Sequence, residues 1–338
     1  MAGICVCVQE LRCSALQEDN QQKSLVVAEK RLALQRRQPD QSIRLAQQQS
    51  LKHHYIPCFY LRRWTAADGM VCEFSRPHKI VRPKRTPPEA TGFQIGLYTV
   101  TGVEPASQSV IEDDFFRRAD QKATDALAFM LANHDGSADM PSTLRSGWSR
   151  FILSLQHRNP ETLAQLKAKC AAALRDRLPE IEASYDDMRG LDDPLTFAEL
   201  KVRLEHDVEH KMWAVLLQDV VDSITVGAFI NRMHWSIVTL QGARHRLLTS
   251  DRPVYMTNGI DHPEGQIIIP VGHNQVFVAV TTPEMEVVLR AQDGVELIRK
   301  INDGCARRAE RFVYDTDDRQ LRFVENRLRR LRPGHTGE

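Results

Sequence analysis

The chain has 338 residues, with 45 Lys and Arg against 44 Asp and Glu and a formal net charge of +1, which excludes a uniformly basic nucleic-acid binder. Apolar residues make up 42% and charged residues 26%, as in soluble globular proteins. No run approaches the ~20 uninterrupted apolar residues of a membrane-spanning helix, and the short apolar start lacks the basic flank of a signal peptide. We therefore expect a cytoplasmic protein with no membrane partner.

Residues 1–50 differ in composition from the rest of the chain. They contain ten glutamines and no aromatic residue. Such a segment buries too little apolar surface to offset the entropy lost on ordering. The prediction is a disordered or loosely helical leader.

Residues 51–108 have the pattern of a small β-rich unit. Strands are predicted at 70–74, after an Asp-Gly turn, and at 96–100. The basic stretch 76–85 between them contains too many prolines for a helix.

Residues 109–232 have helical periodicity. Apolar residues recur near every 3.6 positions and predict helices over about 109–133, 141–159, 160–178 and 196–229. Proline in the first turn marks the start of the third helix.

Residues 233–315 return to short β-branched segments. Strands are predicted at 235–240, 246–249, 266–270 and 275–280, followed by a helix ending near 311 and a further strand. The fold class is therefore α+β, with a central helical bundle flanked by N-terminal and C-terminal β-containing segments that can share one sheet. We expect one domain over 51–315 and a basic C-terminal tail over 316–338.

The block from His53 to Trp64 concentrates polar and aromatic chemistry where this domain begins. His53, His54 and Tyr55 offer a general base, a metal ligand or a phosphate contact. The structural alternative is that one histidine is exposed while the other closes the domain by a hydrogen bond. Adjacent strand residues point to opposite faces, so we expect only one of the two histidines at any one site.

Several fragments in this order resemble the bacterial family of unknown function DUF4238. They are His54-Tyr-Ile-Pro-Cys-Phe-Tyr-Leu61, Glu112, Phe151-Ile-Leu-Ser-Leu-Gln-His-Arg-Asn-Pro160, Leu248-Thr-Ser-Asp-Arg-Pro-Val254, Ile269-Pro270, Asn302 and Arg311-Phe-Val-Tyr314. The resemblance covers about residues 52–315. It implies one folded domain and a set of candidate positions, Asn302 among them, but no activity.

Four of these positions suggest a reaction. His54 can act as a base or a ligand, Glu112 and Asp251 as acidic partners, and Arg158 as a phosphate clamp. The leading hypothesis is a metal-dependent nuclease or other phosphoester hydrolase that uses a divalent metal such as Mg²⁺. The alternative is a non-catalytic module that binds protein or nucleic acid, in which the same side chains form a structural network.

Two of the four have simple structural explanations. A cation such as Arg158 is favoured at a helix C-terminus by the helix dipole. Asp251, at a strand end before Arg-Pro, can accept its own backbone amides in an Asx-turn. Convergence of the four side chains in space would favour a site instead.

A histidine pair lies in the acidic part of the helical region. His206, Glu209 and His210 match the H-x-x-E-H order of an inverted zinc signature, and the spacing puts both imidazoles on one helix face. A peptidase of this kind needs a third ligand near the pair. Chance explains such a match in a charged helix of a chain with 12 histidines.

Charge is distributed unevenly along the chain. Residues 52–85 carry eight Lys and Arg against two acids, a balance of +6, and residues 180–209 carry ten acids against three bases, a balance of −7. Basic residues interleaved with Phe59, Tyr60, Trp64 and Phe74 suit phosphate contact and base stacking. Nucleic acid is therefore a candidate partner of 52–85, and mutual pairing of the two charged surfaces is the alternative.

Overall fold

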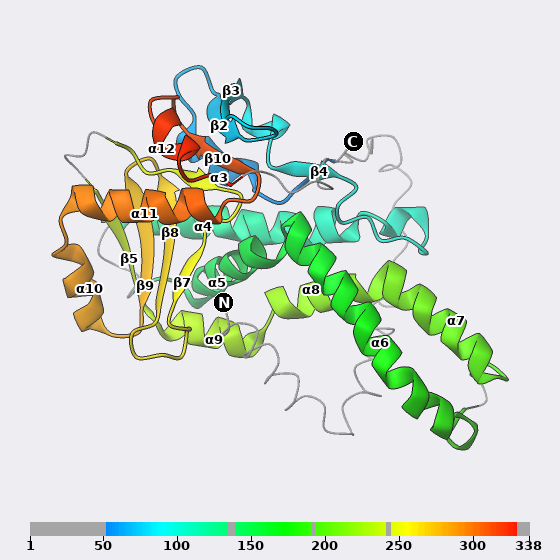
Figure 1. Ribbon diagram of the computed structural model, residues 1–338. Helices are drawn as coiled ribbons and strands as arrows, with labels where there is room; N and C mark the ends of the chain where they lie inside the picture. Colours follow the sequence, from blue (N-terminus) through cyan, green and yellow to red (C-terminus); the bar gives the residue numbers. More distant parts are fainter. Residues whose placement is uncertain (1–51, 134–138, 191–192, 241–244, 330–338) are drawn as a thin grey trace, which may run out of the picture.

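The computed structural model describes residues 52–133, 139–190, 193–240 and 245–329 (Figure 1). The strands are β1 (Lys52–His54), β2 (Val71–Ser75), β3 (Arg82–Thr86), β4 (Phe93–Ile95), β5 (His234–Thr239), β6 (Thr249–Ser250), β7 (Tyr255–Thr257), β8 (Gln266–Gly272), β9 (Gln275–Val280) and β10 (Phe312–Asp315). The α-helices are α3 (Cys58–Leu61), α4 (Arg117–Ala132), α5 (Ser142–His157), α6 (Pro160–Met188), α7 (Phe197–Asp207), α8 (Trp213–Val221), α9 (Ile224–Arg232), α10 (Pro283–Arg290), α11 (Gly294–Arg308) and α12 (Leu321–Glu325). The shorter helical turns are η2 (Arg62–Trp64), η3 (Pro88–Ala90) and η4 (Pro105–Ser107), and the π-helical turns are η5 (Ile111–Phe116) and η6 (Val208–Met212). The leader 1–50 lies outside the described residues.

Antiparallel sheets join the two ends of the domain. One has the order β3-β2-β10-β6 and so combines strands from both β-containing segments, as the sequence predicts. A second has the order β5-β9-β8-β7, and β1 pairs with β4 in a small third sheet. The α+β fold class is confirmed.

The second sheet is covered on both faces. Alternation along β9 places Val276, Val278 and Val280 in the cluster that contains apolar residues of α10 and α11. Phe277 lies on the opposite face, with its ring 5.4 Å from that of Trp148 on α5. Figure 1 shows α11 running across the strands. Both faces must therefore be apolar, which explains why β9 reads as a continuous apolar run.

Two of the expected β features differ from the structure. Residues 96–100 do not form a strand, because Gly96 adopts φ +65° and its carbonyl accepts a turn hydrogen bond from Thr99 N–H. The strand in this region is β4, which ends at Ile95, one residue before the expected strand begins. Conversely, β3 forms within the proline-containing basic stretch, which is tolerated because β3 is the edge of its sheet.

The helical region follows the predicted order with shifted boundaries. Helix α6 continues through Pro179 to Met188, past the expected end near 178. One interior proline removes a single ladder hydrogen bond, which a 29-residue helix tolerates here. The run expected over 196–229 is interrupted by η6 and by a break at Asp222, after which the Ser223 side chain caps α9.

The described part of the expected C-terminal tail is folded. It carries α12 and buries Val324 and Leu328 in a cluster with Phe74 and Val313. Helix α10, which the sequence did not predict, begins with Pro283 in the first turn.

One helical run of the described chain, Phe197–Arg232, is long and apolar enough to span a membrane by length and composition alone. This is weak evidence, because core helices pass the same test. The expectations of a cytoplasmic location and of no membrane partner remain predictions.

Candidate functional site

Three of the four candidate side chains converge. His54 ends β1, paired with Phe93 of β4. Glu112 lies in the π-helical turn η5, and Arg158 caps the C-terminus of α5. The His54 N–H donates to Glu112 Oε1 at 3.4 Å, and the charge of Arg158 acts on the ionisation of both His54 and Glu112. Single π-helical turns inside longer helices occur frequently at functional sites.

Arg158 is the most deeply buried member of this cluster. Its side chain is 0% exposed, and Nη1 donates to Asp120 Oδ1 at 3.0 Å and Oδ2 at 3.3 Å. The guanidinium lies 5.4 Å from the ring centroid of Phe116 and 5.8 Å from that of Phe151. Its Nε and Nη2 have no hydrogen-bond partner. One edge of the guanidinium, formed by Nε and Nη2, therefore makes no hydrogen bond although it is buried beside two aromatic rings.

Glu112 and His54 present complementary unused atoms. Glu112 Oε2 and His54 Nε2 are buried without a partner. Burial raises the pKa of Glu112 to about 7, against the opposing charge of Arg158. Burial lowers the pKa of His54, although a hydrogen bond to the main chain of Glu89 partly offsets this. Near neutral pH the pair therefore combines a neutral imidazole with a carboxyl close to its midpoint.

These unused atoms do not satisfy one another. Among the described residues, no ion pair within 4.0 Å joins Glu112 to Arg158. Buried polar atoms in native proteins almost always have a partner, and leaving one without costs about 1–3 kcal/mol. Each of His54, Glu112 and Arg158 thus has at least one buried polar atom that no described residue satisfies.

His53 lies on the other side of β1. Its Nδ1 accepts from Tyr98 N–H at 2.7 Å, and its ring stacks on that of Tyr98 at 5.5 Å. Burial lowers the pKa of His53. The two histidines therefore point apart, as strand geometry requires. His53 makes a hydrogen bond of the kind that the structural alternative expects, but His54 is half-buried and not exposed as that alternative requires.

Asp251 belongs to a separate cluster. Its carboxylate accepts from the N–H groups of Glu310, Arg311 and Phe312 at 3.0, 2.6 and 3.2 Å. Burial raises the pKa of Asp251 to about 7, although these hydrogen bonds oppose the shift. The carboxylate thus fastens the start of β10. The Asp251 carboxylate accepts hydrogen bonds from three consecutive backbone amides, as the Asx-turn alternative expects. These amides, however, are distant in sequence and do not belong to its own turn.

Tyr55 and Asn302 are also buried. The Tyr55 hydroxyl has no partner and lies in the field of Asp251 and Arg311, and burial raises its pKa well above the ordinary value. Asn302 accepts from Leu248 N–H at 2.8 Å and donates to the Arg246 carbonyl at 2.7 Å. Asn302 is fully engaged in holding α11 against the segment that leads into β6.

The histidine pair of the zinc signature faces another surface. The rings of His206 and His210 lie 4.4 Å apart, and His210 Nδ1 hydrogen-bonds the Thr101 hydroxyl. The described residues contain no group of three or more His, Cys, Asp or Glu side chains placed to hold a metal ion. They therefore fit neither a peptidase zinc site at this pair nor, at the cluster of His54, Glu112 and Arg158, a metal site built from three or more such ligands.

The aromatic residues of the basic segment are core residues. Tyr60, Trp64 and Phe74 are fully buried, and Phe59 packs against the main core. The prediction that such rings stack on bases is wrong, because their spacing serves packing against α5 and the sheets. Any nucleic-acid contact of 52–85 would be electrostatic.

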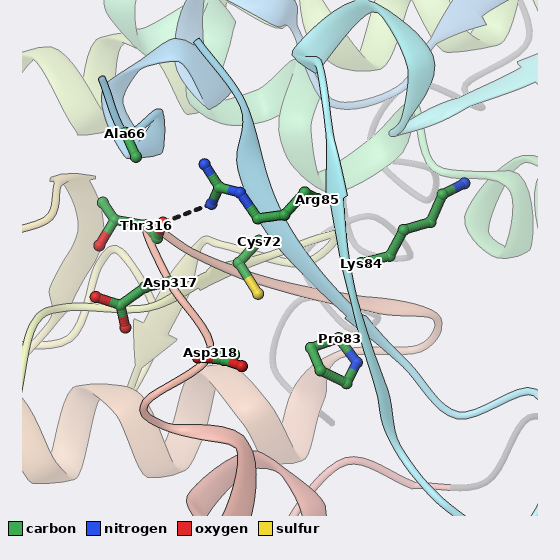
Figure 2. Close-up of a pocket in the computed structure, with 8 residues that line it drawn as sticks. All are labelled: Ala66, Cys72, Pro83, Lys84, Arg85, Thr316, Asp317 and Asp318. Carbon is green, nitrogen blue, oxygen red and sulfur yellow. Dashed lines mark hydrogen bonds between the residues drawn. The ribbon is translucent and has the colours of Figure 1, made fainter. Parts of the chain in front are cut away.

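Figure 2 shows a pocket of about 350 Å³ that none of the candidate site residues lines. Its lining combines basic residues of β3 with the acidic loop after β10: Ala66, Cys72, Pro83, Lys84, Arg85, Thr316, Asp317 and Asp318. Arg85 is held by the Thr316 carbonyl at 2.6 Å. Burial raises the pKa of Cys72 to about 12, so its thiol is not a nucleophile at neutral pH.

Asp120 and Tyr98 were missed by the sequence analysis. Asp120 pairs with Arg158 across 38 positions, and the Tyr98 hydroxyl donates to the Arg158 carbonyl. The only sequence signal was that Asp120 follows Ala119, a residue of the apolar face of α4. A carboxylate next to the apolar face of a helix can be expected to be partly buried. Which cation it pairs with depends on tertiary packing, which the sequence pattern does not show.

Comparisons with known proteins agree with the resemblance stated from the sequence. The family model described as "Protein of unknown function (DUF4238)" matches residues 52–319. Neither a curated protein nor a solved structure matched. Because the match covers most of the chain, including β1, η5 and the end of α5, the chain belongs to the DUF4238 family.

Proposed function

We propose that this protein is a phosphoester hydrolase whose site is formed by His54, Glu112 and Arg158. The observation that carries the proposal is the set of buried atoms without a partner: His54 Nε2, Glu112 Oε2 and Arg158 Nε and Nη2. A guanidinium edge with two free donors matches two oxygens of a phosphoryl group.

The residues supply complementary roles in such a reaction. Arg158 would bind the phosphoryl oxygens, and neutral His54 would take a proton from the attacking water. The water oxygen bonds to phosphorus while the ester P–O bond breaks, and protonated Glu112 gives its proton to the leaving alkoxide. Because the described residues offer no group of three or more such metal ligands, no step is routed through a metal.

Access to this site requires a local movement. The turn η3 contributes the Glu89 main chain to His54, and the Glu89 side chain pairs with Arg62 at 2.6 Å. Both members of that pair are more than half exposed, so the pair adds little stability. Opening of η3 would uncover His54 Nε2.

A non-catalytic binding module is the second candidate function. It is favoured by the complete burial of Arg158 and by the satisfied hydrogen bonds of Asp251 and Asn302. In that case the unused atoms of the cluster hold buried water, and no reaction depends on them.

Hydrolysis of bis(p-nitrophenyl) phosphate by the full chain distinguishes the two functions. We expect turnover that persists in EDTA, falls below the lowered pKa of His54 and falls again above about pH 7, where Glu112 loses its proton. His54→Gln is expected to lower kcat about 100-fold.

His78→Gln is the matched control, because His78 is exposed in the turn before β3; it should leave kcat unchanged. Equal rates for His54→Gln and wild type, or turnover that appears only with added Mg²⁺ or Mn²⁺, would overturn the acid–base assignment.

A further inference from the structure

The second half of α6 and all of α7 form an arm that projects from the sheets (Figure 1). We call the described residues 180–190 and 193–209 the acidic arm, with nine acids against three bases. Helix α7 buries none of its residues. Met188, Leu195 and Val202 are 69%, 76% and 67% exposed. Large apolar side chains exposed together with a strong excess of one sign of charge are typical of an interaction surface.

A surface of opposite character lies at the β2–β3 hairpin. We call residues 76–85 the basic hairpin, with five Lys and Arg and no acid. Lys79, Arg82 and Lys84 are exposed and form no ion pair with any described residue. Ile80 is 54% exposed among them. The basic hairpin thus combines an exposed apolar side chain with a net charge opposite to that of the acidic arm.

Geometry decides how these surfaces can meet. Figure 1 places β2 and β3 at one end of the molecule and the tips of α6 and α7 at the other, so the two surfaces of one chain do not touch. Strand β3 is an edge strand, and Pro83 with its charged neighbours disfavours pairing with another strand. The surface suits a helical, acidic occupant.

We propose that the acidic arm of one chain docks on the basic hairpin of a second copy. The contact is head-to-tail, so each chain in a pair keeps one free arm or hairpin unless the assembly closes. Charge attracts the two surfaces, and Ile80 with the apolar residues of the arm supplies buried area. This interaction involves none of the residues assigned to hydrolysis.

Sedimentation of the full chain at low and high salt tests the proposal. We expect concentration-dependent association at about 0.02 M salt that is lost at about 1 M, where the Debye length falls to about 3 Å. One variant reverses the arm (Glu182→Lys, Asp186→Lys, Asp187→Lys) and another the hairpin (Lys79→Glu, Arg82→Glu, Lys84→Glu). Each alone is expected to weaken association at least about tenfold. An equimolar mixture should restore it, since each variant then meets its complement.

Reversal of Arg299, Lys300 and Arg307 to Glu is the matched control, because these exposed residues of α11 lie outside both surfaces. It should associate like the wild type. A chain that stays monomeric at low salt overturns the proposal, as does association that survives either reversal or a mixture that fails to associate. A monomer that binds an oligonucleotide through the basic hairpin also overturns it, in favour of a nucleic-acid partner.

Discussion

Replacing Arg158 by methionine is expected to lower the free energy of unfolding by about 3–5 kcal/mol, the usual cost of breaking a buried ion pair. The change removes the cation that pairs with the carboxylate of Asp120, whose pKa is already raised by burial. Methionine fills much of the space that the Arg158 side chain occupies beside the rings of Phe116 and Phe151. The loss of stability therefore measures the removal of the charge more than the creation of a cavity.

Urea denaturation of four proteins measures this effect: wild type, Arg158→Met, Asp120→Asn and the double variant. Because the double variant leaves no unpaired charge, it should be more stable than Arg158→Met. Arg150→Met is the matched control on the same helix, since its ion pair with Asp222 is more than one-third exposed. A loss for Arg158→Met no greater than that of this control would show that the pair does not hold the cluster together.

Replacing Glu112 by glutamine is expected to change how stability depends on pH. The pKa of Glu112 is raised from 4.5 to about 7 in the folded protein. Between these two pKa values the folded state therefore keeps a proton that the unfolded state loses. The contribution of this proton to the free energy of unfolding is fully present below about pH 4.5 and is lost as pH rises through about 7. A shift of this size corresponds to about 3 kcal/mol.

Denaturation of the wild type and of Glu112→Gln near pH 5 and near pH 8 gives the comparison. Glutamine cannot ionise, so the variant should gain about 2.5 kcal/mol relative to the wild type between these two conditions. Asp251 and His157 titrate in both proteins and cancel in the difference. Asp113→Asn is the control, because Asp113 pairs on the surface with Arg117 at 2.5 Å. A difference in unfolding free energy between the wild type and Glu112→Gln that is the same at both pH values would contradict a buried, protonated Glu112.

Local patterns predicted most elements of this fold but only part of the site. The periodicity of α4 and α5 and the β-branched run of β9 each reflect burial on a known face, so sequence alone places them. The path of α6 through Pro179 and the turn at Gly96 depend on single backbone positions, which local propensity describes poorly.

The grouping of polar residues depends on contacts distant in sequence. His54 meets Glu112 across 58 positions, and no pattern in one sequence indicates that pairing. Asp251 was expected with them because it ends a strand before Arg-Pro. Its position in the structure is set by the amides at the start of β10, which the sheet brings to it.

The most direct test of the proposed site is a crystal of the full chain soaked in tungstate, a phosphate analogue whose heavy atom can be located unambiguously. The proposal predicts one ion within hydrogen-bond distance of Arg158 Nε and Nη2, with His54 Nε2 and Glu112 Oε2 facing it. Tungstate found only on Lys79, Arg82 and Lys84, with ordered water between His54, Glu112 and Arg158, would contradict a phosphoester site. It would leave the cluster as a hydrated structural network.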